Sequence, residues 1–492
     1  MDLLINLDRG GKTSLYIQLY KQIKKAIIEN RLKANSKLPA IREMADQLDI
    51  NPATVVKAYN LLEREQLIYK RVGSGSYVSG NYVGSSGKRI NLDRVSSEVA
   101  DEPDLLEYGQ IQVDSDINFA SATPTPDLFP VKDFKRMINR VLDRDGGEAF
   151  VYQKSQGYYP LRESIQAQLN KQGIEVDIDN IQIVSGAQQA IDLIAKILVD
   201  FEDTVLVEEP TYSGALSAFQ SRGARIKSIP LLSNGLDLNK LEEVLPDIDV
   251  SFIYVMTSFQ NPTGISWSRE AKEGLLKLAG KYNFLIIEDD CLSDLYYQGE
   301  RPVPLKAYDR DDRVIYIKSY SKIFMPGLRL AFMILPKNLI PSILAAKYAT
   351  DISSSGLTQR AFDLYLREGL WDRHLEKMRQ LFKKRFQMMK IMMKSFPSEV
   401  SLIFEPQGGL YFWLSLPEDV DSESFYRMAL KNGVAFLPGR VFSVKEGNLP
   451  LFRLSFAAVD EPEIKRGMDL LARLLREFIE KGNRREGYLP LL

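Results

Sequence analysis

Residues 314–332 read VIYIKSYSKIFMPGLRLAF, and this stretch decides the fold of the larger part of the chain. It begins with a β-rich apolar run, Val314–Ile317, and continues through a polar turn to Lys322 and Arg329. Similar runs alternate with helical patterns upstream, at Ile181–Val184, Thr204–Val207, Ser251–Met256 and Phe284–Ile287. Such alternation predicts βαβ units and a mainly parallel α/β sheet.

Chemically informative residues follow these runs, where a parallel sheet binds its ligands. Tyr212, Asn261 and Asp289 come after the second, third and fourth runs, and Lys322 comes after the fifth. The first run leads into Gly186-Ala187-Gln188, which starts a helix and exposes backbone N–H groups to an anion. Alone, each feature has an ordinary explanation, such as a surface lysine or a helix cap. Their repetition at successive strand ends favours one shared site.

These residue types suit an aldehyde cofactor that carries a phosphate. Lys322 can form a Schiff base, and Asp289 can keep a pyridine nitrogen protonated. Asn261 can donate to a ring phenolate oxygen, and Tyr212 offers a face for stacking. The predicted phosphate cup consists of Ser319, Ser321, Arg329 and the helix start at Gly186, Ala187 and Gln188. The sequence therefore predicts pyridoxal 5'-phosphate on Lys322.

Composition excludes several other kinds of chemistry in this 492-residue chain. Cys291 is the only cysteine and His374 is the only histidine, so we expect no metal site, no internal disulfide and no Ser-His-Asp triad. His374 matches no motif and is interpreted as structural. No apolar run reaches the ~18 residues of a membrane span, and the N-terminus lacks a signal-peptide pattern. We expect a cytoplasmic protein with no membrane partner.

The charge is unevenly distributed along the chain. Residues 1–92 hold 15 Lys and Arg against 8 Asp and Glu, a net charge of +7, whereas the remainder carries −8. A basic segment on an acidic body indicates a polyanion partner for that segment alone, although a solvated basic face would show the same balance.

Three helices are predicted in this basic segment. The first has apolar residues at helical spacing from Tyr16 to Ile27. The second is expected to begin at Pro39, and the third to begin at Pro52 with Asn51 as its cap. The apolar positions of the second and third helices are Ile41, Met44, Ala45 and Leu48, and Val55, Ala58, Tyr59 and Leu62.

A β-hairpin follows, with strands at Leu67–Arg71 and Ser76–Ser79 around Gly73-Ser74-Gly75. Three helices and a hairpin predict a winged helix-turn-helix, whose third helix enters the major groove of double-stranded DNA. A helical module for protein contacts is the alternative. The candidate DNA contacts are Arg42, Asn51, Thr54, Lys57, Asn60, Arg71 and Gly75.

Three segments are therefore predicted. Residues 1–80 form the DNA-binding domain and residues 116–492 form the cofactor-binding domain. Residues 81–115 are rich in Gly, Ser, Asp and Glu without a sustained period, which predicts a flexible linker.

The N-terminal motifs resemble the DNA-binding domain of GntR-type bacterial regulators. The resemblance rests on Leu38-Pro39, on Asn51-Pro52-Ala53-Thr54-Val55, and on Gly73-Ser74-Gly75-Ser76-Tyr77-Val78. One position departs from the pattern, because many of these regulators have a base-reading arginine where this chain has Val56. That role passes to Lys57 or is absent.

From about Ile117 to Phe456 the chain is similar to fold-type I aminotransferases. The shared motifs are IVSGAQQAIDLI, VEEPTYSG, FQNPTG, IIEDD, SYSKIFMPGLRLAF and LFRLSFA. The resemblance implies a large α/β domain with a small α+β C-terminal domain, and a homodimer. It also implies that Arg453 binds a ligand α-carboxylate and that Tyr152 reaches the cofactor phosphate of the partner subunit. Cys291 stands where similar proteins often have a tyrosine, which weakens the case for efficient transamination.

Taken over its whole length, the chain is similar to MocR-type regulators, which join these two domains. This resemblance implies a bacterial transcription factor, nucleoid-associated when bound to DNA, that senses an amino acid, an amine or pyridoxal phosphate itself. An active amino-acid aminotransferase with an accessory DNA-binding domain is the alternative. A structural dimer without cofactor is disfavoured by Lys322, Asp289 and Arg329.

Overall fold

The computed structural model describes residues 5, 7, 15–28, 31–33, 35–64, 67–71, 75–79, 115–445, 447 and 449–480. The chain divides into two compact units, Met1–Asp101 and Glu102–Leu492, and each is considered by itself. Apart from Ser115, the predicted linker at 81–115 lies outside the described residues.

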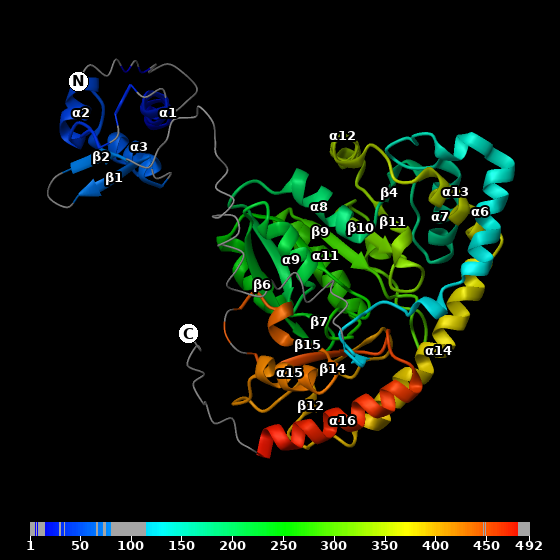
Figure 1. The fold of residues 1–492 in the computed structure, drawn as a ribbon. Helices are drawn as coiled ribbons and strands as arrows, with labels where there is room; N and C mark the ends of the chain where they lie inside the picture. Colours follow the sequence, from blue (N-terminus) through cyan, green and yellow to red (C-terminus); the bar gives the residue numbers. More distant parts are fainter. Residues whose placement is uncertain are drawn as a thin grey trace. The chain divides into compact units, whose positions relative to one another are not determined.

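The N-terminal unit has the predicted arrangement of three helices and an antiparallel hairpin (Figure 1). Its elements are α1 (Leu15–Ile28), α2 (Ile41–Leu48), α3 (Pro52–Arg64), β1 (Ile68–Arg71) and β2 (Gly75–Val78). The apolar side chains predicted for α3 are all buried, at Val55, Ala58, Tyr59 and Leu62. The winged helix-turn-helix prediction is confirmed, with strand bounds that differ slightly from those expected.

The two helix starts differ in how well they were predicted. Asn51 caps α3 as expected, since its Oδ1 accepts the Ala53 N–H at 2.8 Å, and Pro52 is the first helical residue. The prediction that Pro39 begins the second helix is wrong, because α2 begins at Ile41 after an extended Ala40. The Pro39 carbonyl instead accepts a hydrogen bond from the Tyr59 hydroxyl at 2.9 Å, which holds this segment against α3.

A mixed eight-stranded sheet forms the centre of the C-terminal unit, in the order β4-β11-β10-β9-β8-β5-β6-β7. Only β11 and β7 run antiparallel to their neighbours, so the α/β prediction is confirmed. The five predicted runs all correspond to strands of this sheet, whereas β6, β7 and β11 were not predicted. The strands are β4 (Ile181–Val184), β5 (Thr204–Glu209), β6 (Arg225–Leu232), β7 (Gly235–Leu236), β8 (Val250–Val255), β9 (Leu285–Asp290), β10 (Val314–Ser319) and β11 (Ala331–Ile334).

Helices surround this sheet, and one pair matters for the site. Helix α8 (Ala187–Leu198) packs on β4, β10 and β11, and α12 (Ile340–Asp351) packs on α8 (Figure 1). The other helices of the large domain are α6 (Val131–Asp145), α7 (Tyr159–Lys171), α9 (Ser213–Gln220), α10 (Leu238–Val244), α11 (Arg269–Tyr282) and α13 (Gly356–Arg367).

The predicted small C-terminal domain is present and is built on a four-stranded antiparallel sheet in the order β12-β13-β16-β15. Its strands are β12 (Ser401–Leu402), β13 (Tyr411–Ser415), β15 (Leu437–Pro438) and β16 (Leu451–Ser455), and β14 (Val434–Ala435) pairs with β3 (Ile117–Asn118). Helix α15 (Ser422–Lys431) packs on β14, while α14 (Leu370–Met393) and α16 (Glu461–Glu480) lie side by side.

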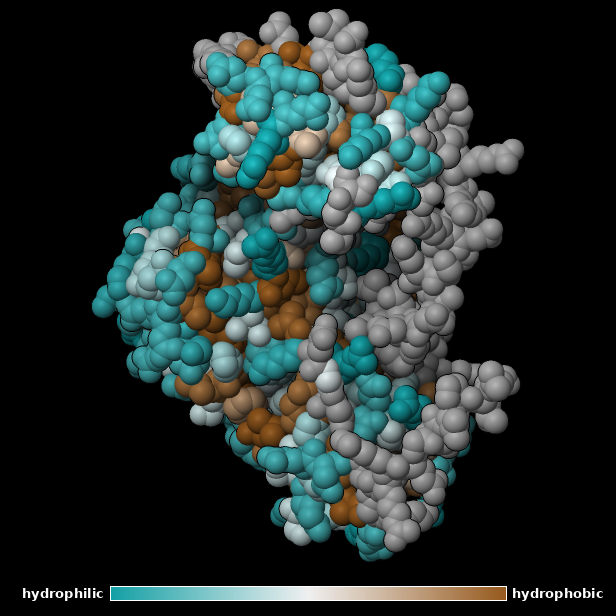
Figure 2. Space-filling model, turned by 90° about the vertical axis from the view of Figure 1, so that its left-hand side faces the viewer, coloured by the Kyte–Doolittle hydropathy of each residue, from teal (hydrophilic) through white to brown (hydrophobic). Residues whose placement is uncertain are grey.

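The face of the molecule in Figure 2 is mostly hydrophilic, with separate apolar patches. Among the helices that the structure describes, none combines the length and apolar character needed to cross a membrane.

Candidate functional site

The carboxyl ends of β8, β9 and β10 lie next to one another and carry the centre of the predicted cofactor site. Asp289, near the end of β9, is only 3% exposed. Its Oδ2 accepts a hydrogen bond from the Tyr254 hydroxyl at 2.7 Å, while its Oδ1 is buried without a partner among the described residues. Burial raises the pKa of Asp289 to about 6, and the Tyr254 hydrogen bond opposes this shift. The unpartnered Oδ1 of Asp289 can accept a hydrogen bond from the protonated pyridine nitrogen of the predicted cofactor.

Lys322 lies in the turn after β10 and is half-buried. Its Nζ makes no hydrogen bond or ion pair with any described residue. Burial lowers the pKa of Lys322, and the positive charges of Arg453 and Arg329 lower it further, against the opposing effects of Cys291 and Asp289. A lysine with a lowered pKa and a free Nζ is suited to attack an aldehyde.

Arg453 on β16 reaches Asn261 in the loop after β8, although the two are far apart in sequence. Its Nη1 donates to the Asn261 Oδ1 at 2.8 Å, and its Nη2 donates to the Ala120 carbonyl. The guanidinium carbon lies 4.7 Å from the Tyr411 ring centroid and 5.0 Å from that of Phe442. Because Arg453 occupies the oxygen of Asn261, the amide N–H₂ of Asn261 is left to donate to another group.

One nitrogen of the Arg453 guanidinium, Nε, is buried and makes no hydrogen bond with the described residues. Burial lowers the pKa of Arg453 to about 10, so the group is still a cation at neutral pH. A buried cation with an unused N–H is complementary to a carboxylate.

The turn between β4 and α8 has the geometry of an anion cup. Gly186 caps α8 with φ +90°, and a Cβ there would lie 2.2 Å from Nη2 of Arg329. That same nitrogen donates to the Ser185 carbonyl at 3.1 Å, so the guanidinium lies directly against the turn. Only glycine admits this approach, which places a cation beside the helix N-terminus.

The remaining predicted cup residues have distinct roles. Ser319, the last residue of β10, accepts the Ser321 N–H on its Oγ at 3.3 Å, which brings the two serines together. Ala187 is the first residue of α8, so it contributes its backbone. The side chain of Gln188 turns away, because its Nε2 donates to the Gly214 carbonyl at 2.8 Å.

Tyr212 caps the start of α9 and lies beside the same site. Its hydroxyl approaches Oε1 of Gln188 at 3.4 Å, and burial raises its pKa to about 12. A Cβ on Gly214 would lie 2.5 Å from the Tyr212 ring, so that glycine gives the ring room. The contact with Gln188 on α8 positions the ring beside the site.

Tyr152 is not brought to the other residues of the site. It is 80% exposed and follows Phe150 and Val151, which are exposed as well. Its expected contact with the cofactor phosphate concerns a second subunit and remains a prediction.

Cys291, the only cysteine of the sequence, acts electrostatically on Lys322, and His374, the only histidine, contacts the residue after it. Cys291 is buried, and burial raises the pKa of its thiol. The Nε2 of His374 hydrogen-bonds the carbonyl of Ile323 at 2.8 Å, directly after Lys322 in the chain. This contact agrees with the structural interpretation of His374.

Three residues that contact Asp289 or Arg453 were not predicted from the sequence, namely Tyr254, Tyr411 and Phe442. Each lies in an apolar stretch and is buried, so nothing local distinguishes it from a core aromatic. The hydroxyl of Tyr411 is buried without a described partner beside Arg453. Only the pairing of strands and the approach of the small domain reveal these contacts.

In the N-terminal unit the predicted DNA contacts are mostly exposed. Arg42 on α2 and Lys57 on α3 are exposed, and Thr54 is half-buried. Lys57 Nζ lies 5.6 Å from the ring centroid of Tyr16. Asn51 acts as the cap of α3, which occupies its side-chain oxygen.

The hairpin orients the remaining candidates. Arg71 lies over the stacked rings of Tyr69 and Tyr77, at 5.6 and 5.3 Å from their centroids. Gly75 has φ +118°, and a Cβ there would meet the Lys37 side chain at 3.0 Å. Asn60 accepts from the Lys70 Nζ at 3.0 Å, so its oxygen is engaged within the protein.

Comparison with known proteins gives two family matches. Residues 115–471 match the aminotransferase class I and II family, and residues 15–78 match the gntR family of bacterial regulatory proteins. An uncharacterized HTH-type transcriptional regulator, YdcR, from Escherichia coli is 30% identical over 94% of this chain and 99% of its own length. Aromatic-amino-acid aminotransferase 1 from Thermococcus litoralis is 32% identical over 79% of this chain and 94% of its own.

A solved structure is similar over the C-terminal part. It is LysN, the α-aminoadipate aminotransferase of Thermus thermophilus, complexed with N-(5'-phosphopyridoxyl)-L-leucine. It superposes with a TM-score of 0.71 at 32% identity and covers 78% of this chain and 99% of its own. That protein holds a phosphopyridoxyl group joined to an amino acid.

Proposed function

Because the chain belongs to the aminotransferase class I and II family and joins that domain to a GntR-type DNA-binding region, it is an HTH-type transcriptional regulator of the MocR type, and we propose that pyridoxal phosphate on Lys322 is its cofactor. We propose further that this domain senses an amino acid, an amine or pyridoxal phosphate itself. The DNA-binding domain then spans residues 1–80, the linker 81–115 and the sensing domain 116–492.

The unpartnered Oδ1 of Asp289 carries this proposal. A buried carboxylate oxygen without a donor is costly unless a ligand supplies one. Pyridoxal phosphate also needs an amine to react with its aldehyde and a cation to bind its phosphate. The free Nζ of Lys322 is such an amine, and Arg329 beside Gly186 is such a cation. The residues present therefore fit pyridoxal phosphate.

When bound, pyridoxal phosphate supplies an electron sink that stabilises negative charge at the carbon of an attached amine. Asp289 would keep the ring nitrogen protonated, because the negative charge of its carboxylate stabilises the protonated nitrogen. Tyr254 fixes the rotamer of Asp289 through its other oxygen. Tyr212 lies beside the site as a stacking face.

An amino-acid ligand is bound by the Arg453 and Asn261 pair. Arg453 presents its unused N–H to the α-carboxylate, while Tyr411 and Phe442 hold the guanidinium through their rings. The N–H₂ of Asn261, which the contact with Arg453 leaves free, would donate to the cofactor ring. The two ligand-recognition groups are therefore fixed relative to one another before ligand binding.

The remaining parts of the proposal concern assembly. A homodimer would place two α3 helices on two half-sites of an operator and would let Tyr152 serve the neighbouring subunit. The ligand-bound state would favour a different arrangement of the DNA-binding units, since a ligand shifts an equilibrium only by its differential affinity. Such a regulator acts in the cytoplasm, on the nucleoid.

An active aminotransferase is the second candidate. The intact contact between Arg453 and Asn261 favours it, because these residues would orient a substrate as well as an effector. Lys322, once released from the cofactor, would then move a proton from the substrate Cα. Cys291 at the position of the usual tyrosine weakens this alternative.

The test is a paired measurement on the full-length protein loaded with pyridoxal phosphate. Its absorption and its affinity for DNA are followed while a panel of amino acids and amines is added. We expect one compound to change both. A compound that yields pyridoxamine phosphate and a keto product without changing DNA affinity would favour the enzyme, and a protein whose two signals never change together would contradict the sensor.

A further inference from the structure

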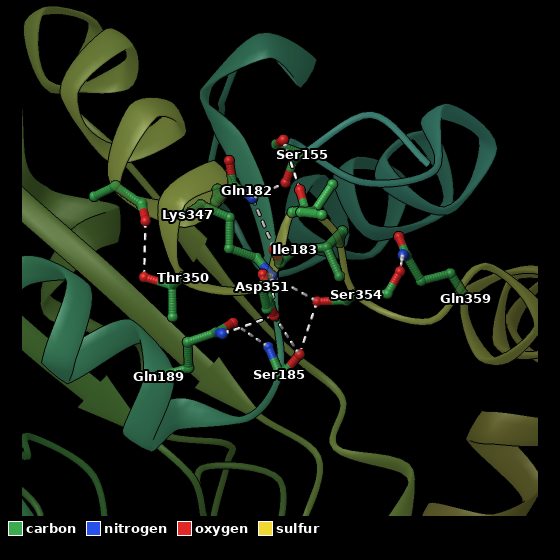
Figure 3. Close-up of polar contacts among 12 residues, drawn as sticks. Ser155, Gln182, Ile183, Ser185, Gln189, Lys347, Thr350, Asp351, Ser354 and Gln359 are labelled. Carbon is green, nitrogen blue, oxygen red and sulfur yellow. Dashed lines mark hydrogen bonds and ion pairs between the residues drawn. The ribbon is translucent and has the colours of Figure 1, made fainter. Parts of the chain in front are cut away.

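A buried lysine that the sequence did not single out, Lys347, lies in a polar cluster with Asp351 and Ser185, the residue before Gly186 (Figure 3). Lys347 on α12 has a side chain with 0% exposure, and its Nζ contacts Asp351 Oδ2 at 2.6 Å and Ser354 Oγ at 3.0 Å. Removing a lysine from water is costly, and a buried ion pair adds little net stability, so its retention here calls for a positional reason.

Asp351, the last residue of α12, joins this lysine to the strand that leads into the cup. Its Oδ2 accepts from Gln189 Nε2 at 2.8 Å and from Ser185 Oγ at 3.3 Å. The Ser185 and Ser354 hydroxyls lie 2.9 Å apart, and the Ser185 N–H donates to the Gln189 Oε1 at 2.8 Å. We call Lys347, Asp351, Ser354, Ser185 and Gln189 the Asp351 cluster. Figure 3 shows its side chains converging from two segments of the chain, residues 185–189 and residues 347–354.

The Asp351 cluster contacts Arg329, the cation of the predicted phosphate cup, through Ser185. The Ser185 carbonyl accepts from Nη2 of Arg329 at 3.1 Å, and Gly186, the next residue, is the one that Arg329 approaches. Ser185 is therefore fixed by its N–H, its hydroxyl and its carbonyl together. The position of the Arg329 guanidinium depends on Ser185, which depends in turn on Asp351.

The segment that follows α12 is also held in place. Ile352 has φ +62°, a conformation that β-branched residues rarely adopt. Its carbonyl accepts from the Ser155 Oγ at 2.7 Å, and the Ser155 carbonyl accepts in turn from Nε2 of Gln182 on β4 at 2.7 Å. The end of α12 is therefore tied to β4 through Ser155, and Asp351 itself is tied to Ser185, the residue after β4.

We propose that Lys347 and Asp351 are a positioning pair for the cofactor phosphate. Asp351 sets the turn that holds Arg329, and Lys347 cancels the charge of the half-buried Asp351 carboxylate, which would otherwise repel the phosphate. The inference rests on the proposed function, because it needs pyridoxal phosphate in the cup. Both residues would act through Ser185 and Arg329.

The first test compares pyridoxal phosphate with pyridoxal, which lacks the phosphate, as probes of the full-length protein. Lys347→Met leaves the Asp351 carboxylate without its counter-charge, so the affinity for pyridoxal phosphate should fall about tenfold or more, while that for pyridoxal changes far less. An equal loss for both probes would show a structural role and would overturn the proposal. So would an unchanged affinity for pyridoxal phosphate.

The double variant Lys347→Met with Asp351→Asn guards against a variant that merely fails to fold. It removes both charges, so the affinity for pyridoxal phosphate should recover most of the loss seen in Lys347→Met. Failure to recover in a folded double variant would contradict the electrostatic part of the inference.

Lys306 offers a matched control elsewhere in the fold. Its Nζ pairs with Asp309 at 2.9 Å, and both side chains are buried. Lys306→Met should lower stability without changing the ratio of the two affinities. If the wild-type protein binds no pyridoxal phosphate at all, the proposed function fails. If the wild type binds it and Lys347→Met binds it equally well, only this inference fails.

Discussion

The proposed cofactor site and the proposed DNA-binding face differ in how firmly the protein holds their side chains. Asp289, Asn261 and Arg453 are buried and held by other residues, and two of them keep an unused buried polar atom. Arg42 and Lys57 are exposed on the surface of their helices. A buried site must be complementary to its ligand beforehand, whereas an exposed cationic face binds a polyanion by charge alone.

The largest expected effect on cofactor binding comes from replacing Lys322, the residue proposed to bind the cofactor covalently. Lys322→Ala should abolish covalent cofactor binding, because the neighbouring Lys318 is already paired with Asp290 and Asp294. Borohydride reduction followed by mapping of the labelled peptide measures this. A reducible adduct that survives in the variant would place the cofactor elsewhere.

Asp289→Asn tests the buried carboxylate, with an expected loss of about a hundredfold in affinity for pyridoxal phosphate. Wild-type affinity should rise as the pH passes about 6, because Asp289 then ionises and pairs with the ring nitrogen. The variant should lack this part of the pH dependence. A variant with the wild-type profile between about pH 5 and 7 would contradict the role.

The same raised pKa predicts the opposite trend for the stability of the apoprotein. Burial raises the pKa of Asp289 in the folded state above its value in the unfolded chain, so the protonated form is favoured by folding. The contribution is present at low pH and is lost as the pH rises from about 4 through about 6. The free energy of unfolding of wild type and Asp289→Asn, measured with denaturant over this pH range, separates the contribution of Asp289 from that of other groups.

Arg453→Lys sharpens the comparison at the ligand. A lysine has a single side-chain nitrogen and cannot keep the contacts with Asn261 and Ala120 while also binding a carboxylate, so amino-acid affinity should fall by about tenfold to a hundredfold. Amines without a carboxylate should lose much less. Equal losses for matched amino acids and amines would remove the carboxylate role of Arg453.

The smallest effect is expected at the exposed face. Arg42→Ala with Lys57→Ala should weaken DNA binding about tenfold and lower the slope of affinity against salt by ~2, with cofactor content unchanged. Titration of labelled DNA at several salt concentrations measures both quantities. DNA binding that persists unchanged at moderate salt would show that the recognition surface lies elsewhere.

The sequence predicted what is local and periodic. Strand ends at Asn261, Asp289 and Lys322 follow apolar runs, and Asn51 with Pro52 marks the start of α3. The helix start predicted at Pro39 was wrong, because the Pro39 carbonyl accepts a tertiary hydrogen bond from Tyr59 and α2 begins only at Ile41. Strand β6 was missed because its alternating exposed residues gave no continuous apolar run.

Contacts between distant segments could not be predicted in this way. The hydrogen bond from Tyr254 to Asp289 depends on β8 and β9 being neighbours in the sheet. The spacing of Lys347 and Asp351 suggests only an ordinary helical pair, and nothing local reveals its burial or its reach to Ser185. Such residues can be recognised only once packing brings distant segments of the chain together.

The most direct test of the account is the absorption spectrum of the full-length protein after loading with pyridoxal phosphate, before and after addition of amino acids and amines. We predict a Schiff-base band that Lys322→Ala lacks and that one compound changes. A wild-type protein without any such band would contradict the cofactor assignment and leave only the DNA-binding half of the account.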